Sequence, residues 1–184
     1  MLIMKRVIIV IIIVAGLFPG CERGDEKVKY SGEIVLTSER ILTDTYRSTG
    51  FSFEEGKIVP YPPVGGVVPD IVVTNETDLE GNITGANFTS PNNLIAFHLE
   101  ASFSTLTEAL AWYEGYNEVT ATDFSALANQ LTPYQVWTVQ TTTQKYAKLV
   151  IKNIEIKTDS PVSDYIAVTY EFQYQPDGSK IFSD

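Results

Sequence analysis

The chain has 184 residues, with 23 acidic against 13 basic residues and a formal net charge of −10, a length sufficient for one compact domain or two small ones. The acidic balance argues against a nucleic-acid partner, because binding to a phosphate backbone depends on basic surface. A single cysteine excludes a disulfide within the chain, so the core must hold the domain together; ten Tyr, nine Phe and two Trp provide material for it.

The first residues have the organisation of a lipoprotein signal peptide. Lys5 and Arg6 precede an uncharged stretch of twelve residues, 7–18, which is followed by Pro19-Gly20-Cys21. This stretch is too short for a membrane-spanning helix, which needs about 20 apolar residues. The end of the stretch resembles a bacterial lipoprotein box, so we expect cleavage after residue 20 and lipidation of Cys21. An ordinary signal peptide with a free thiol and an uncleaved signal anchor are the alternatives.

Cleavage and lipidation would place the protein in the bacterial cell envelope. The expected site is the outer membrane, on its periplasmic or its surface face, with the lipid as the membrane anchor. Residues 21–31 are charged and nearly free of large aliphatic side chains, which is typical of a flexible tether. Residues 32–184 are expected to form a single β-rich domain.

Short β-prone runs occupy the first half of this domain. The last of them alternates apolar and polar side chains, which places His98 and Glu100 on the more polar face of a half-buried strand. The first two are expected to belong to one sheet, and the segment from 75 to 93 to be irregular or a short hairpin. The expected strands are residues 34–36, 51–53, 70–74 and 94–103.

Two helices are expected between residues 104 and 131. The first follows Ser104 as N-cap and ends near Gly115, with apolar residues at helical spacing. The second runs from 122 to 131 and stops before Pro133.

The last third has the pattern of an antiparallel meander, with strands at 136–143, 145–157 and 165–175. The apolar set of the middle strand changes parity near Lys152-Asn153, which predicts a bulge. A turn is expected at 176–178, and Ile181-Phe182 can supply a short returning strand. The predicted fold class is therefore mainly β, with antiparallel sheets and one or two short helices inserted around residues 104–131.

Three segments of this last third resemble the HmuY-like family of bacterial lipoproteins, of Bacteroidetes type. They are Gln144-Lys145-Tyr146-Ala147-Lys148-Leu149, the strand at 165–174, and Tyr174-Gln175-Pro176-Asp177-Gly178-Ser179. The resemblance is strongest from 137 to 182, with weaker echoes at 50–53 and 69–71. It implies a mostly β fold with a helical insertion. It also implies haem binding for iron acquisition, in which paired axial side chains, typically two histidines, hold the iron.

The chain departs from the family in its ligand pair. After cleavage it has one histidine, His98, and no methionine, so one chain cannot supply His/His or His/Met ligation. If haem binds, His98 acts with a tyrosinate, a water or a second chain opposite. The candidate tyrosines are Tyr113, Tyr116 and Tyr134, which flank the helical insertion. The alternatives are a His98 that hydrogen-bonds within the fold and tyrosines that belong to the core.

Motifs for catalysis are absent from the sequence, which has no G-x-S-x-G, no H-E-x-x-H and no glycine-rich phosphate loop. We therefore expect no catalytic residues, no metal site of the chain's own and no enzyme. The expectation is a lipid-anchored binding module with haem as the candidate cofactor. The alternative is a structural or accessory envelope lipoprotein that binds a protein partner and no haem.

Overall fold

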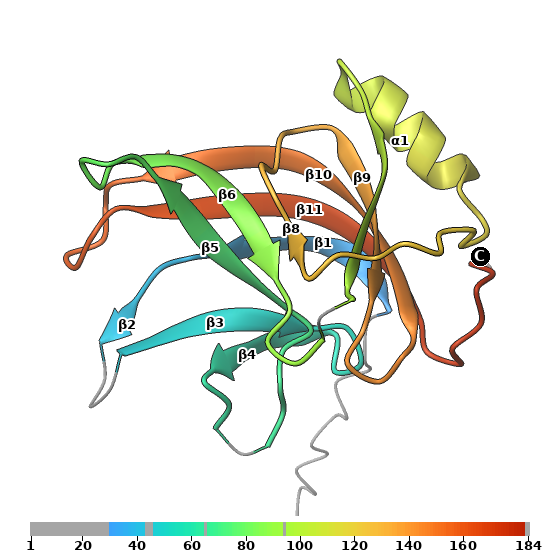
Figure 1. Cartoon of the computed structure of the whole chain (residues 1–184), viewed down its shortest axis with the longest axis horizontal. Helices are drawn as coiled ribbons and strands as arrows, with labels where there is room; N and C mark the ends of the chain where they lie inside the picture. Colours follow the sequence, from blue (N-terminus) through green and yellow to red (C-terminus); the bar gives the residue numbers. More distant parts are fainter. Residues whose placement is uncertain (1–29, 43–45, 65, 94, 183–184) are drawn as a thin grey trace, which may run out of the picture.

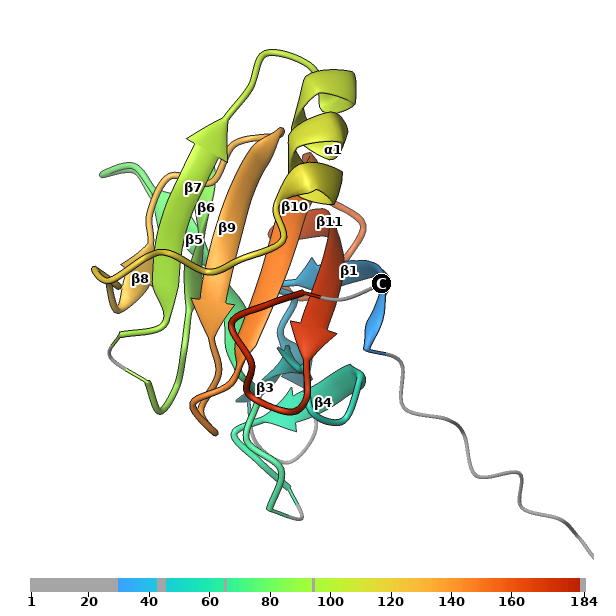
Figure 2. The same ribbon diagram turned by 90° about the vertical axis from the view of Figure 1, so that its right-hand side faces the viewer.

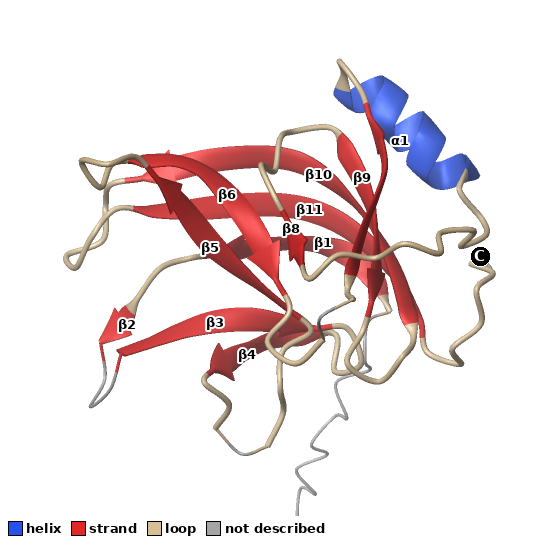
Figure 3. Ribbon diagram, in the orientation of Figure 1, coloured by secondary structure: helices blue, strands red, loops and turns tan. Residues whose placement is uncertain are grey.

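The computed structural model describes residues 30–42, 46–64, 66–93 and 95–182. It confirms the predicted fold class, since the protein is mainly β, with 50% strand, 7% helix, antiparallel sheets and a single short helix (Figure 3). The signal peptide, Cys21 and most of the expected tether lie outside the described residues. No helix in the described part of the chain has the length and apolar character needed to cross a membrane.

Two sheets face one another across the core (Figure 1). Sheet 1 contains, in spatial order, β1 (Ser31–Thr37), β11 (Tyr165–Gln175), β10 (Tyr146–Lys157), β9 (Gln135–Gln140) and β7 (Phe97–Ser102). Sheet 2 contains β2 (Ile41–Leu42), β3 (Tyr46–Ser52), β5 (Ile71–Thr77), β6 (Ile83–Thr89) and β8 (Leu127–Ala128), with β4 (Lys57–Tyr61) paired to β3.

The core lies between the sheets and is rich in aromatic side chains. Alternate residues of β11 point into it, as the period-two pattern predicts, and Tyr170 and Phe172 are fully or almost fully buried. From sheet 2, Phe51 packs edge-on against Phe172, with ring centroids 4.9 Å apart. Each such ring contributes about 1.5–3 kcal/mol by its burial, so these contacts hold the two sheets together.

The predicted meander and its bulge are confirmed. Strands β9, β10 and β11 pair antiparallel in sequence order, and the register of β10 against β11 shifts between Ile151 and Asn153. The extra residue, Lys152, lets Ile151 and Ile154 both contact the core. The turn at 176–178 is also present, with Gly178 at a φ of 77°. Ile181 makes an isolated bridge with Glu118, so the expected short strand is reduced to one pair.

Two expectations for the first half need correction, whereas the expected hairpin is present as the pairing of β5 with β6. Residues 34–36 and 51–53 lie in different sheets, because β1 pairs with β11 whereas β3 pairs with β4 and β5. The segment expected as irregular or a short hairpin forms, with β5, a hairpin of two seven-residue strands. Ser31, the last residue of the expected tether, begins β1, and the carbonyl of Tyr30 already accepts a hydrogen bond of 2.7 Å from Tyr174 N.

The second expected helix is wrong. Residues 122–131 are irregular apart from a bridge at Ser125 and the short strand β8, and they connect the two sheets: Ser125 N donates to the carbonyl of Phe97 at 2.8 Å, and Ala128 pairs with Phe88. The backbone groups of this segment therefore hydrogen-bond to strands of the two sheets instead of to one another within a helix. Gln130, with a φ of 51°, also departs from helical geometry.

The first helix is confirmed as α1 (Leu106–Gly115), which lies across the outer face of sheet 1 (Figure 2). Its N-cap is Thr105 rather than Ser104, since the Thr105 hydroxyl accepts a 3.3 Å hydrogen bond from Glu108 N.

Asp70, just before β5, is a buried link between the sheets. Its carboxylate accepts hydrogen bonds from Phe53 N at 2.9 Å and from both N and Oγ1 of Thr142 at 3.0 Å. Burial raises the pKa of this carboxyl, and the hydrogen bonds from Thr142 and Phe53 offset part of that increase. Asp70 thus joins the start of β5 to the β9–β10 turn at a cost in desolvation.

Candidate functional site

The helix α1 is held on sheet 1 by a small apolar cluster. Ala109 and Tyr113, on one side of the helix, are buried against Val136 of β9 and Val150 of β10. Because positions 109 and 113 are four residues apart, they lie on the same face of the helix. This contact fixes where the chain emerges from the helix at Tyr116.

Lys148 ties the end of α1 to the sheet. Its side chain is buried, and Nζ donates hydrogen bonds to the carbonyl oxygens of Tyr113, at 2.9 Å, and Tyr116, at 2.8 Å. These are carbonyls at the C-terminal end of a helix, where a cation is favoured by the helix dipole. Nζ also lies 4.7 Å from the centroid of the Tyr113 ring and 5.2 Å from that of Phe182.

Glu100 gathers two hydroxyl groups beneath this helix end. Its Oε1 accepts hydrogen bonds of 2.6 Å from Tyr116 OH and 2.6 Å from Thr138 Oγ1, and the two hydroxyl oxygens are 2.9 Å apart. The Glu100 side chain is only 9% exposed, so these donors replace much of its hydration. The Tyr116 ring stacks on Trp112, with centroids 4.9 Å apart, which fixes the phenol from its other side.

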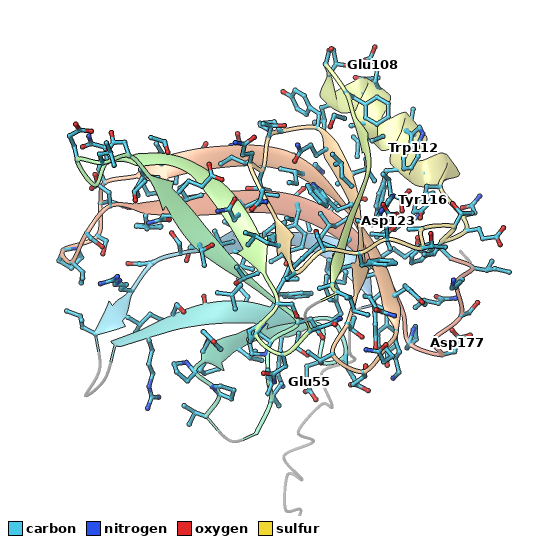
Figure 4. All side chains as sticks on the ribbon, viewed as in Figure 1. Glu55, Glu108, Trp112, Tyr116, Asp123 and Asp177 are labelled. Carbon is cyan, nitrogen blue, oxygen red and sulfur yellow. The ribbon has the colours of Figure 1, made fainter. Side chains whose placement is uncertain are left out.

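His98 lies on the same strand face as Glu100. Its Nδ1 is 2.8 Å from the backbone carbonyl oxygen of Asp123 and 3.2 Å from the Asp123 carboxylate, while Nε2 is 3.9 Å from Glu100 Oε2. In the tautomer in which Nδ1–H donates to the Asp123 carbonyl, Nε2 is the nitrogen that can act as an acceptor. His98 therefore hydrogen-bonds within the fold, and its partner is the segment after α1. Figure 4 shows Trp112, Tyr116 and Asp123 together in this region.

A groove of about 450 Å³ opens beside the imidazole, and we call it the His98 groove. Its walls are apolar and polar in similar measure and include the side chain of Leu99, which is 41% exposed. A pocket of this volume is within the usual range for small-molecule sites. It is lined by Phe97, His98, Leu99, Asp123, Phe124, Ser125, Leu127, Asn129 and Trp137.

The three candidate tyrosines lie outside this groove. Burial raises the pKa of Tyr113 far above its usual value, and burial followed by the hydrogen bond to Glu100 does the same for Tyr116. Both side chains are therefore neutral phenols. Iron is bound by the deprotonated tyrosinate, so these two tyrosines are poor ligands for it. Tyr134 packs against the apolar cluster under α1. The structure brings His98 and Tyr116 to one carboxylate, but it does not pair them across a haem.

Two residues of this site were missing from the predicted set. Glu100 had a sequence signal, because it stands two positions from His98 on an alternating strand and shares its face. Asp123 had none, since it is 25 positions from His98 and meets it only through the path of the chain after α1.

The described residues contain no cluster of three or more His, Cys, Asp and Glu side chains that could hold a metal ion. Of the four predicted ligand-binding residues, His98 lines the groove and the three tyrosines do not. Comparison of the chain with protein-family models, with curated proteins and with solved structures gives no match.

Proposed function

We propose that this chain is a non-enzymatic, lipid-anchored binding protein of the bacterial cell envelope, and that the His98 groove receives a flat ligand that carries both apolar and polar groups. Haem is the candidate, in keeping with the resemblance to HmuY-like lipoproteins. The observation that carries the proposal is the groove itself, in which an oriented imidazole stands beside the aromatic side chains of Phe124 and Trp137.

The orientation of His98 supports a ligand contact through Nε2. Histidines that bind metals commonly donate their other ring N–H to a carbonyl or carboxylate, which fixes the ring. Asp123 provides both kinds of acceptor to Nδ1, at 2.8 and 3.2 Å. The Glu100 carboxylate lies farther from Nε2, at 3.9 Å, and the His98 side chain keeps 24% of its surface exposed. A bound haem would supply an iron centre that accepts this nitrogen.

A haem titration tests the proposal. Haem is added to the protein lacking residues 1–21 and the Soret band is recorded for the parent, His98→Ala and Tyr116→Phe. We expect a shifted band in the parent and in Tyr116→Phe, and its loss in His98→Ala. An unshifted band in the parent, or one that His98→Ala leaves unchanged, would refute haem binding in this groove. The protein-partner alternative would then be favoured.

The lipid anchor is tested separately. Cys21→Ser should release the protein from the membrane fraction if the Cys21 thiol carries the lipid. Retention of the variant in that fraction would favour an uncleaved signal anchor instead.

A further inference from the structure

Carboxylate groups lie at both ends of the chain segment that lines the His98 groove. This segment runs from Asp123 to Asn129. Asp123 and Glu100 lie beside the imidazole at its start, and Glu76 of β5 lies beside its end. The contacts of each carboxylate show whether its negative charge is still able to act on a ligand.

Asp123 lines the groove and keeps its carboxylate in solvent. Its side chain is 89% exposed, and Oδ1 lies 3.2 Å from His98 Nδ1. A histidine binds a metal ion as the neutral ring. In that state the imidazole does not neutralise Asp123, so a ligand in contact with Nε2 would lie close to a negative charge.

Glu100 adds a second negative charge on the other side of the imidazole. Its Oε2 lies 3.9 Å from His98 Nε2, whereas Oε1 accepts hydrogen bonds of 2.6 Å from Tyr116 OH and Thr138 Oγ1. Both donors are neutral hydroxyls, which stabilise the carboxylate without cancelling its charge. Because the Glu100 side chain is only 9% exposed, water screens its charge less than it screens the charge of Asp123.

Glu76 places a third negative charge at the far end of the segment. Its Oε1 accepts a 3.3 Å hydrogen bond from the backbone N of Gln130, which directly follows Asn129. The same N–H also donates to Asn87 Oδ1, at 2.9 Å. A backbone N–H is likewise a neutral donor, so the Glu76 carboxylate keeps its charge.

An anionic group within the groove would therefore be repelled from either end. The chain as a whole adds to this repulsion, since its formal net charge is −10. Haem carries two propionate groups, both on one edge of its ring, and the opposite edge is uncharged. The charges around the groove favour entry of the uncharged edge.

We propose that the His98 groove selects its ligand by charge, receiving the uncharged edge of a metal-bearing macrocycle while any anionic substituent stays outside in solvent. The ligand class is accordingly a metalloporphyrin that is neutral or cationic where it enters. This inference rests on the proposed function, because it needs a metal in contact with His98 Nε2. It goes further in assigning the orientation of the ligand and its charge preference.

Paired Soret titrations test the proposal, with haem and haem dimethyl ester as probes. The diester has the same ring but lacks both negative charges. The protein lacks residues 1–21, which leaves every described element complete, since β1 begins at Ser31. The variants are Asp123→Asn and Glu76→Gln, which keep an acceptor oxygen. The control is Glu55→Gln, which removes the same charge from an exposed side chain outside the groove.

We expect the diester to bind about tenfold more tightly than haem, because two repelled charges are absent. Asp123→Asn and Glu76→Gln should each narrow the affinity ratio of the two probes about threefold, and Glu55→Gln should leave the ratio unchanged. Salt at about 1 M should also narrow the ratio, since it screens exposed charges. Thermal unfolding of each variant shows whether it is folded.

Two results would overturn the charge preference while leaving the proposed function intact. One is haem bound through His98 at least as tightly as the diester. The other is an affinity ratio that Asp123→Asn and Glu76→Gln change no more than Glu55→Gln does. A Soret band that neither probe shifts would refute the proposed function as well, so the failures of the two proposals are distinguishable.

Discussion

Replacing Lys148 by methionine tests how the end of α1 is held over the candidate site. Methionine keeps most of the buried stem but has no ammonium group. The carbonyl oxygens of Tyr113 and Tyr116 would then lose donors at 2.9 and 2.8 Å. We expect Lys148→Met to destabilise the protein and to loosen the helix from sheet 1.

The size of the stability loss follows from two contributions that favour the buried lysine and one that disfavours it. A hydrogen bond from a charged donor contributes about 1.5–3 kcal/mol, and there are two of them. A cation near a helix C-terminus adds about 0.3–1 kcal/mol. Against these stands the cost of burying an ammonium group, several kcal/mol per ion, which methionine does not incur. The net loss should be about 2 kcal/mol, equivalent to a fall in Tm of about 4–8 °C for a domain of this size.

Urea unfolding provides the measurement, with Lys145→Met as the control. Lys145 belongs to the same strand region, but its ion pair with Glu54 is partly exposed, so its loss should cost at most about 1 kcal/mol. Hydrogen exchange of the amides at 106–115 should also accelerate more in Lys148→Met than in Lys145→Met. Equal stabilities for the two variants, with unchanged exchange in α1, would refute this account of the lysine.

Three further predictions use matched changes. Tyr116→Phe removes a donor to a carboxylate and should destabilise by about 1–3 kcal/mol, whereas Tyr170→Phe removes a buried hydroxyl with no hydrogen-bond partner among the described residues and should stabilise by about 1 kcal/mol. Gly50→Ala would place a carbon 2.4 Å from a proline Cβ and should cost about 1–3 kcal/mol, whereas Gly115→Ala, at the end of α1, meets open space and should gain about 0.5–1 kcal/mol. Asp70→Asn should destabilise and should also reduce the pH dependence of stability, because the pKa of Asp70 is raised from 3.8 by folding. The stabilisation from its protonation is complete below pH 3.8 and is lost as the pH rises through the folded-state pKa, so the parent should lose more stability than the variant as the pH is raised from 3.8 through that value.

Chemical or thermal denaturation checks all three predictions, with the pH series measured on the parent and Asp70→Asn together. Equal effects of the two tyrosine changes would contradict the hydrogen-bond assignments. A Gly50→Ala variant as stable as Gly115→Ala would contradict the close approach of the two strands. A parallel pH dependence for the parent and Asp70→Asn would contradict the raised carboxyl pKa.

Local pattern was sufficient for those elements whose sequence neighbours are also their partners in space. The alternation in 165–175 predicted β11, and the parity change at Lys152 predicted the bulge, because a strand with one buried face must realign after an inserted residue. The apolar spacing of 122–131 was misleading for the opposite reason. Phe97 and Phe88, distant in sequence, supply backbone partners of that segment in place of a helix.

The candidate site could be predicted only in part for the same physical reason. His98 and Glu100 share a strand face, which the alternation indicates directly. Their contacts with Asp123 and Tyr116 depend on where α1 ends and how the chain returns across sheet 1, and Lys148 fixes that end through backbone carbonyls. Because every residue has a backbone carbonyl, the residue types do not indicate which carbonyls Lys148 contacts.

The solitary histidine also makes the protein convenient to observe. A single imidazole gives a single pair of ring C–H resonances, so proton NMR of an unlabelled sample can follow the His98 groove without assignment of the spectrum. The ring packs near Phe124, with centroids 6.0 Å apart, and aromatic ring currents make its resonances sensitive to any displacement of that segment. A ligand in the groove should move these signals, and a ligand bound far from it should leave them in place. The chain thus carries its own reporter for the His98 groove.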